Sequence, residues 1–260
     1  MRDDDREQEH GRSGILADLA VAIAFLSRLP AALASHAPGR LARASRAFPA
    51  AGLLIGALGA IAYVVAWGLE LYPLPAALVA VAVLVWLTRA LHEDGLADFT
   101  DGLAGATPEH RLQIMRDVHV GSFGVLALIL ALAFRVVTLA EIADPGAVAR
   151  VLIAGAALSR AAVVVLMARL PLARPDGLAR EAGRPSGDEV TVAVGIGLAA
   201  TFLLLPWLPA LLCTLFAAAG SFAVAWLARQ RLGGVSGDVL GASQQAAEIG
   251  FLLAAAVSLT

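Results

Sequence analysis

The run Val190–Ala228, VTVAVGIGLAATFLLLPWLPALLCTLFAAAGSFAVAWLA, contains no charged residue in 39 positions. A membrane-spanning helix needs about 20 predominantly apolar residues, so this run is long enough to cross a membrane twice. Pro206-Trp207-Leu208-Pro209 lies at its middle and predicts a tight turn between the two crossings. The stretch therefore indicates a membrane protein built from helices joined by short turns.

The rest of the chain has the same apolar character. Of its 260 residues, 59% are hydrophobic and 15% are charged, whereas soluble domains are about 45–50% apolar and about 25% charged. Five more runs that are uncharged or nearly so are Ala47–Leu69, Leu71–Thr88, Gly121–Ala140, Ala147–Leu170 and Ser243–Thr260. Open strands cannot satisfy their backbone in lipid, so we expect an all-α, polytopic membrane bundle of about seven transmembrane helices.

The N-terminal region differs from these runs. Ile15–Leu29 is apolar but short and contains Asp18 and Arg28, so we expect a short interfacial or re-entrant helix there. Residues 1–12 mix acidic and basic side chains and lack the basic start of a signal peptide. We expect residues 1–12 to form a disordered charged tail, and residues 13–260 to form a single transmembrane catalytic domain.

Several function classes are excluded by composition. The single cysteine, Cys213, excludes a disulfide framework and a cysteine-based zinc site. The formal net charge of −2 excludes a broadly cationic nucleic-acid-binding protein, so no nucleic-acid partner is expected. All 19 basic residues are arginines, which excludes a P-loop lysine, a Schiff-base lysine and a lysine general base.

The loops between the spans alternate in character. One set is long, polar and rich in arginine, and comprises Pro30–Arg46, His92–Val120, Pro171–Glu189 and Arg229–Ala242. The other set is short and contains no arginine, and comprises Glu70–Pro73, Glu141–Gly146 and Pro206–Pro209. Because arginine-rich loops stay on the cytoplasmic side, we expect the long polar loops to face the cytoplasm.

The most informative polar stretch is His92–Gly102, HEDGLADFTDG. Asp94, Asp98 and Asp101 are spaced i, i+4 and i+7, which places three carboxylates on one face of a helix. Like charges at this spacing repel one another. Mg²⁺ binds carboxylate oxygens together with substrate phosphates, so we predict that these aspartates hold Mg²⁺. The alternative is a solvated acidic loop.

A second polar stretch, Arg116–Gly124, precedes a span. Its glycines and hydroxyl group could present backbone N–H groups to a phosphate at a helix N-terminus, and Arg116 is a candidate phosphate ligand. The alternative is an ordinary junction between a loop and a helix.

A third stretch runs from Gly233 to Gln245 and is rich in glycine. Gly237 and its neighbours suit close approach to a nucleotide, and Asp238 could bind metal or ribose. Gln244 shares a helix face with Glu248, an acid inside a span and so a functional candidate. The alternative is that Glu248 pairs with Arg28, Arg135 or Arg160. All three stretches lie on the predicted cytoplasmic side, which indicates one active site for a phosphate-bearing substrate.

Eight stretches, in the same order, resemble the cobalamin synthase family of adenosylcobinamide-GDP ribazoletransferases, which complete nucleotide-loop assembly in vitamin B12 biosynthesis. They are Phe25–Pro30, Phe48-Pro49, Leu91–Asp98, Asp101–Leu103, Met115–Asp117, Gly121–Leu126, Ala173–Gly177 and Ser236–Ala242. The resemblance extends over about residues 15–260.

The resemblance implies a phosphoryl transfer in which the 3′-hydroxyl of α-ribazole, or of its 5′-phosphate, attacks adenosylcobinamide-GDP and GMP leaves. It implies Mg²⁺ on the three aspartates, with Asp94 also in the catalytic centre, and Glu93 or His92 as the group that takes the hydroxyl proton.

Asp238 and Gly237, with Gln244 and Gln245, are then expected to hold the guanosine or the ribazole. The expected location is a bacterial inner membrane with the active site facing the cytoplasm. A homo-oligomer and a complex with other enzymes of B12 assembly both stay open as partners.

Two other readings compete with this one. The first is a CDP-alcohol phosphotransferase or a prenyltransferase, both of which place aspartates and Mg²⁺ at the end of a span. The second is a transporter with Glu248, Arg135 and Arg160 as coupling charges in the membrane. Release of GMP that depends on Mg²⁺ discriminates the transferase from a transporter, because a transporter would release none.

Overall fold

The computed structural model describes residues 3–30 and 40–259, with side chains described from residue 14 onward. Within these residues the chain is helical and contains no β-strand, apart from an isolated bridge between Leu172 and Val235 that joins two loops. The predicted all-α architecture is confirmed. The helices in chain order are α1 (Asp3–Leu26), α2 (Arg40–Ala44), the 3₁₀ helix η1 (Ser45–Ala47), α3 (Phe48–Gly68), α4 (Pro73–Leu87), α5 (Leu91–Gly102), α6 (Pro108–Ile114), α7 (Ser122–Ile142), α8 (Pro145–Arg169), α9 (Leu178–Ala182), α10 (Gly187–Leu204), α11 (Trp207–Leu232) and α12 (Gly237–Leu259).

The number of apolar helices agrees with the number of uncharged runs. Six stretches are long and apolar enough to cross a membrane: Arg40–Gly68, Ser122–Ile142, Pro145–Arg169, Gly187–Leu204, Trp207–Leu232 and Gly237–Leu259. Helices α4 and α5 pass the same test only as a pair bent by 86°, which brings the count to seven. Helix α4 is apolar, and the acidic residues of this pair all lie on α5.

Local sequence sets the ends of these helices. The predicted turn in Val190–Ala228 is confirmed, since α10 ends before Pro206 and α11 begins directly after it. At the start of α8 the Asp144 carboxylate accepts a hydrogen bond from the Ala147 N–H at 2.6 Å. Such a cap satisfies one of the free N–H groups of the first helical turn, which matters at a junction between two membrane helices.

Glycines allow the spanning helices to pack closely. A Cβ atom on Gly52 of α3 would lie 2.4 Å from the Ala156 carbonyl oxygen of α8. A Cβ atom on Gly220 of α11 would likewise lie 2.4 Å from the Ala246 carbonyl oxygen of α12. Lipid tails are as apolar as leucine, so close contact between small residues drives helix association in membranes. The bundle is therefore held together by backbone proximity at these crossings.

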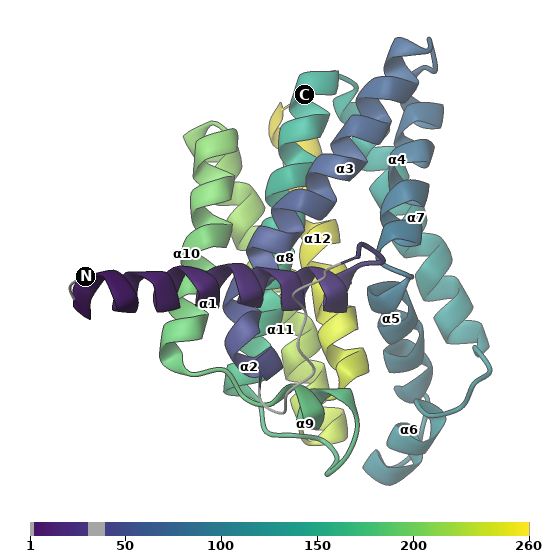
Figure 1. Ribbon diagram of the computed structural model, residues 1–260. Helices are drawn as coiled ribbons and strands as arrows, with labels where there is room; N and C mark the ends of the chain where they lie inside the picture. The colour runs from purple at the N-terminus through teal and green to yellow at the C-terminus, as the bar shows by residue number, and fades with distance from the viewer. Residues whose placement is uncertain (1–2, 31–39, 260) are drawn as a thin grey trace.

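The polar elements gather at one end of the bundle (Figure 1). Helices α2, α5, α6 and α9 lie at this end, and the short connections after α3, α7 and α10 lie at the other. Helix α1 runs across the bundle rather than along it, as expected of an interfacial helix. Its Asp18 is buried and accepts hydrogen bonds from Arg46 at 3.0 and 2.6 Å, so this charge inside an apolar segment is neutralised.

Helix α1 begins at Asp3 and continues without a break to Leu26. Aspartate, glutamate, glutamine and arginine are compatible with a helix, and no proline precedes Pro30. The division into a tail and a catalytic domain stays a prediction.

Candidate active site

A strained bend places α5 at the polar end of the bundle. Two residues other than glycine, Arg89 (φ 58°) and Ala90 (φ 53°), have left-handed backbone between α4 and α5. This conformation costs roughly 1–2 kcal/mol per residue, and such strain concentrates at functional sites. Beyond the bend α5 lies against α7 and α12. The bend therefore brings the acidic stretch His92–Gly102 against the start of the last helix.

Glycines let α5 and α12 approach to backbone contact. A Cβ atom on Gly95 would lie 2.9 Å from the Asp238 carbonyl oxygen, and one on Gly241 would lie 3.2 Å from the His92 carbonyl oxygen. A side chain at Gly95 would therefore force the backbones apart, and a side chain at Gly241 would have little clearance. Two stretches singled out by sequence, about 145 residues apart, meet here and share one site.

Three aspartates gather at this crossing. Asp94 is exposed, while Asp98 and Asp238 are half-buried. Burial and the neighbouring carboxylates, with Asp94 first and Asp238 next, raise the pKa of Asp98 to about 7. Arg174 opposes this effect, and its Nη2 lies 3.7 Å from Asp238 Oδ2. One guanidinium among three carboxylates leaves the cluster acidic.

Asp101 stands apart from the other two members of the predicted triad. Its Oδ2 accepts a hydrogen bond from the Gly121 N–H at 2.7 Å, and its Oδ1 accepts one from the Gly124 N–H at 2.9 Å. A Cβ atom on Gly124 would lie 2.4 Å from Asp101 Oδ2, so a side chain there would displace the carboxylate. Both carboxylate oxygens thus hold the start of α7, which the i+7 spacing alone did not reveal. This geometry does not support the predicted metal role of Asp101.

The remaining carboxylates do not form a metal cage on their own. Among the side chains of residues 14–30 and 40–259, no group of three or more His, Cys, Asp or Glu is arranged so that it could hold a metal ion. Mg²⁺ is commonly bound through one or two carboxylates plus substrate phosphates. Asp94 and Asp98, one turn apart on α5, are therefore the candidate ligands from the predicted set, and Asp238 lies beside them.

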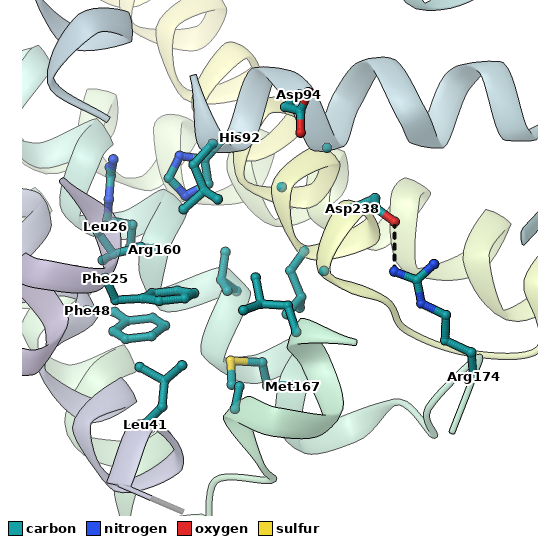
Figure 2. Close-up of a pocket in the computed structure, with 18 residues that line it drawn as sticks. Phe25, Leu26, Leu41, Phe48, His92, Asp94, Arg160, Met167, Arg174 and Asp238 are labelled. Atoms are coloured by element: carbon teal, nitrogen blue, oxygen red, sulfur yellow. Dashed lines mark ion pairs between the residues drawn. The ribbon is translucent and has the colours of Figure 1, made fainter. Parts of the chain in front are cut away.

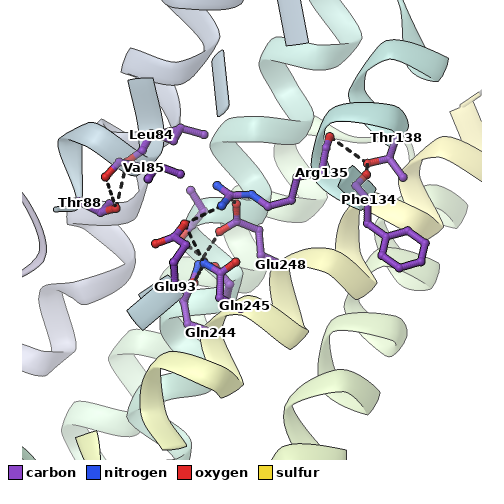
Figure 3. A network of polar contacts seen from close by, with 12 residues as sticks. Leu84, Val85, Thr88, Glu93, Phe134, Arg135, Thr138, Gln244, Gln245 and Glu248 are labelled. Atoms are coloured by element: carbon purple, nitrogen blue, oxygen red, sulfur yellow. Dashed lines mark hydrogen bonds and ion pairs between the residues drawn. The ribbon is translucent and has the colours of Figure 1, made fainter. Parts of the chain in front are cut away.

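A second polar cluster lies inside the bundle (Figure 3). Arg135 of α7 donates a hydrogen bond to Glu93 at 2.7 Å, and its other terminal nitrogen lies 3.0 Å from Glu248. All three side chains are buried. Of the partners that the sequence left open for Glu248, the structure selects Arg135 as the one in an ion pair.

The two glutamines belong to the same cluster. Gln245 donates to Glu93 at 3.3 Å, and Gln244 donates to Ser159 at 3.1 Å and also contacts Glu248. Each glutamine is 1% exposed. The sequence had suggested Gln244, Gln245 and Glu93 as substrate-binding or catalytic groups, but these side chains bond to one another and to their neighbours inside the protein. Glu93 Oε2 and Gln245 Oε1 have no hydrogen-bond partner among the described residues. Consecutive helical residues point in different directions, which explains why Glu93 turns inward and Asp94 does not.

Arg116 also has a protein partner. Its Nη2 donates to both carboxylate oxygens of Asp176, at 2.7 and 2.8 Å, in an exposed ion pair. This pair ties the segment before α7 to the loop between α8 and α9, which carries Arg174. Sequence reasoning proposed Arg116 as a phosphate ligand and did not single out Arg174. The signal for Arg174 was the stretch Ala173–Gly177, which was used only for its resemblance to the family.

A cavity of about 170 Å³ opens beside the aspartates (Figure 2). Its polar end is formed by His92, Asp94, Arg160, Arg174 and Asp238. Its apolar end includes Phe25, Leu41, Phe48 and Met167. Gly237, at the start of α12, also lines it. The sequence indicated the polar residues on α5 and α12, but not the apolar wall supplied by α1, α2, α3 and α8.

The arrangement suits chemistry on a phosphate group. Carboxylates at the mouth can bind a divalent cation, and the guanidinium groups of Arg160 and Arg174 can bind phosphate or other acceptors. His92 is buried and lines the cavity, and burial with the nearby Arg160 and Arg135 lowers the pKa of its imidazole. The neutral ring therefore has a nitrogen that can accept a hydrogen bond from a hydroxyl group. Cation binding, anion binding and proton transfer can therefore meet within one cavity.

The comparisons with known proteins agree with this chemistry. Residues 18–256 match the protein family described as cobalamin-5-phosphate synthase. A relative from Bradyrhizobium diazoefficiens, named adenosylcobinamide-GDP ribazoletransferase, is 43% identical over 244 residues, which cover 93% of this chain and 94% of the relative. Relatives of the same name from Rhizobium etli (strain CIAT 652) and Brucella ovis are 46% identical over 253 residues and 38% identical over 260 residues. These alignments cover 93% and 95% of this chain, and 97% and 99% of the relatives. No solved structure matches the chain.

Proposed function

Because this chain belongs to the cobalamin-5-phosphate synthase family, we propose that it is an adenosylcobinamide-GDP ribazoletransferase. In this reaction the 3′-hydroxyl oxygen of α-ribazole, or of its 5′-phosphate, forms a bond to the phosphorus that carries the cobinamide. The bond between that phosphorus and the GMP oxygen breaks, and the hydroxyl proton passes to a base. The products are GMP and adenosylcobalamin or its 5′-phosphate.

One observation carries the proposal beyond the family assignment. Asp94 and Asp98 from α5 and Asp238 from α12 converge with Arg174 at the mouth of a cavity. Phosphoryl transfer requires positioning and charge stabilisation more than covalent chemistry by the protein. A cluster of carboxylates with a nearby guanidinium supplies both kinds of interaction with a diphosphate.

We include Mg²⁺ as the cofactor. The hard carboxylate oxygens of Asp94 and Asp98, crowded by Asp238 and only partly balanced by Arg174, fit this cation. Asp101 is a weaker candidate, because each of its oxygens already accepts a hydrogen bond from α7. When bound, Mg²⁺ neutralises the diphosphate and stabilises the departing GMP.

The geometry favours His92 over Glu93 as the group that takes the hydroxyl proton. His92 lines the cavity in which the nucleophile must lie. Glu93 is held by Arg135 and Gln245 on the other side of α5. A general base must come within hydrogen-bond reach of the proton that it removes, and His92 meets this requirement with less rearrangement.

We further propose that the polar end of the bundle faces the cytoplasm of a bacterial inner membrane. Arg111, Arg116, Arg174, Arg180 and Arg184 lie in the short helices and loops at this end, as the positive-inside rule requires of a cytoplasmic face. Single cysteines in the 171–189 loop and at Pro206, on a Cys213→Ser background, should label from opposite sides of the membrane. Labelling from the same side would contradict this topology.

The test of the activity uses the full chain in nanodiscs. Adenosylcobinamide-GDP and α-ribazole are added across a Mg²⁺ titration, and GMP and adenosylcobalamin are quantified. We expect the two products in equal amounts, with a rate that depends on Mg²⁺. Release of GMP without formation of the cobalamin, or no release at all, would reject the proposal.

The transporter reading is not favoured. Arg135 and Glu248, which that reading treats as coupling charges, neutralise each other in a buried ion pair. The family assignment also separates this chain from the CDP-alcohol phosphotransferases and prenyltransferases.

A further inference from the structure

The apolar end of the cavity has no assigned role in the phosphoryl transfer. Phe25 of α1 stacks on Phe48 of α3, with ring centroids 5.7 Å apart and planes inclined by 13°. Val163 and Met167 of α8 continue this wall. The cavity of about 170 Å³ is comparable with the apolar cavity of ~150 Å³ that holds a benzene ring in an engineered protein. It is therefore large enough for a small aromatic group.

Two guanidinium groups at this cavity each have a nitrogen without a hydrogen-bond partner among the described residues, Arg160 Nε and Arg174 Nη1. Arg160 of α8 is 2% exposed, and its Nη1 donates to the Ala156 carbonyl oxygen one turn earlier in the same helix. Its Nε has no hydrogen-bond partner among the described residues. The two nearby glutamates, Glu93 and Glu248, form their ion pairs with Arg135 instead. Because an unsatisfied buried donor is unfavourable, a ligand that enters the cavity should bring an acceptor.

The groups of the two substrates can be compared with this cavity. A corrin ring with its side chains is far larger than about 170 Å³. Guanine carries donors and acceptors on several edges, which a wall of phenylalanine, valine and methionine would leave unpaired. The 5,6-dimethylbenzimidazole of ribazole is flat and apolar, and its one free ring nitrogen accepts a hydrogen bond. This group matches the apolar wall, and its nitrogen can accept from one free N–H group. Of the two free donors, that of Arg160 lies on α8 together with Val163 and Met167 of the wall.

We infer that the apolar end of the cavity is the subsite for the aromatic base of the attacking nucleoside, with the Arg160 Nε–H donating to the free ring nitrogen of the base. This inference rests on the proposed function. It places the attached ribose towards Asp94 and Asp238 at the polar end, where the 3′-hydroxyl reacts. It also makes Val163, Met167 and the Phe25–Phe48 pair determinants of which bases are accepted.

The first test fills the apolar end. Val163 is 6% exposed and lines the cavity, so Val163→Phe should obstruct the base. We expect the KM for α-ribazole to rise about tenfold or more, with a smaller rise for the riboside of unmethylated benzimidazole. The KM for adenosylcobinamide-GDP should stay within about twofold of its original value. The rise is smaller for the unmethylated base because that base lacks two methyl groups, and each methyl group has a modest effect on binding in an apolar pocket.

A matched control lies two residues away on the same helix. Val165 lines a separate apolar groove of about 550 Å³ between α8, α10 and α11, so Val165→Phe adds the same ring outside the cavity. It should leave both KM values unchanged. If Val163→Phe instead raises the KM for adenosylcobinamide-GDP and spares that for ribazole, the inference is overturned.

The second test removes the hydrogen bond from either side. An α-riboside of 5,6-dimethylindole keeps the shape of the base but has C–H in place of the free nitrogen. Wild-type enzyme should bind it about tenfold more weakly than α-ribazole, in line with a hydrogen bond to a charged group. In Arg160→Met this preference should disappear. An equal preference in both proteins would overturn the role of Arg160.

Binding of the two ribosides to wild-type protein, measured by titration calorimetry in nanodiscs, keeps the inference testable if a variant does not fold. Equal affinities there would count against it. The proposed function fails separately, when wild-type protein forms no GMP from adenosylcobinamide-GDP and ribazole.

Discussion

The centre of the bundle and the mouth of the cavity both contain acidic residues and arginines, but their charges are organised differently. At the centre, Arg135 lies between Glu93 and Glu248 with contacts of 2.7 and 3.0 Å, and the side chains are less than 10% exposed. At the mouth, Asp94 and Asp98 have no ion pair within 4 Å among the described residues, and Arg174 comes only within 3.7 Å of Asp238.

The contrast separates structural from functional charge. A buried ion pair is already satisfied, and breaking it leaves an uncompensated charge in the protein. An acidic cluster that the protein does not neutralise is available for an added cation or for substrate. Glu93 and Asp94 are neighbours in sequence yet lie on opposite sides of this division. Variants of the two regions should therefore differ in whether they lose stability or activity.

The largest effect is expected from Asp94→Asn or Asp98→Asn. Each change removes a charge at the mouth and keeps the size of the side chain. Turnover should fall by at least about 10³-fold, because the charge that stabilises the transition state is lost. Stability should be unchanged or slightly higher, since repulsion between neighbouring carboxylates is relieved. GMP release and thermal unfolding, measured in parallel, report the two quantities.

Asp188→Asn is the matched control for these variants. Asp188 is an exposed aspartate in the first turn of α10, so the same change there should alter neither quantity. Near-normal turnover by Asp94→Asn, with an unchanged Mg²⁺ dependence, would argue against a catalytic role for the aspartates at the mouth of the cavity.

Arg135→Met should produce the opposite result. The change leaves the carboxylates of Glu93 and Glu248 buried without their cation, at a cost of about 3–5 kcal/mol in the free energy of unfolding. We expect loss of folded protein in thermal or denaturant unfolding. The loss of activity should be no larger than the loss of folded protein. Arg229→Met replaces an exposed arginine of α11 and should be neutral. A folded but inactive Arg135→Met protein would mean that the central network takes part in catalysis.

Asp101→Ala tests a residue whose sequence spacing places it with the metal-binding aspartates at the mouth, but whose hydrogen bonds indicate a structural role. The Gly121 and Gly124 N–H groups would lose their acceptor, so stability should fall by about 1.5–3 kcal/mol. The Mg²⁺ concentration needed for half-maximal activity should not change. A shift in that concentration with unchanged stability would restore Asp101 to the metal site.

The smallest effect is expected from Arg116→Ala. The Arg116–Asp176 pair is exposed on both sides, and such pairs contribute about 0–1 kcal/mol. Turnover should stay close to that of the wild type, because Arg174 and not Arg116 lines the cavity. An activity loss as large as that of Asp94→Asn would show that Arg116 leaves Asp176 to bind substrate.

Much of the fold could be predicted because it depends on local sequence. An uncharged run of about 20 residues must be a helix if it crosses lipid, whatever its neighbours are, and a Pro206 turn divides a longer run in two. The shared face of Asp94 and Asp98 follows from helix periodicity in the same way. These features require no knowledge of which helices touch.

The pairing of charges could only be decided by tertiary structure. Arg135 and Arg160 are each an arginine within an apolar span, and nothing near them in sequence distinguishes their roles. The packing of α5, α7 and α12 places two glutamates against Arg135 and leaves the buried Arg160 Nε without a hydrogen-bond partner among the described residues. Asp101 likewise acquires its partners 20 and 23 residues along the chain. An ion pair or a cavity depends on distances between separate helices, which helical periodicity does not specify.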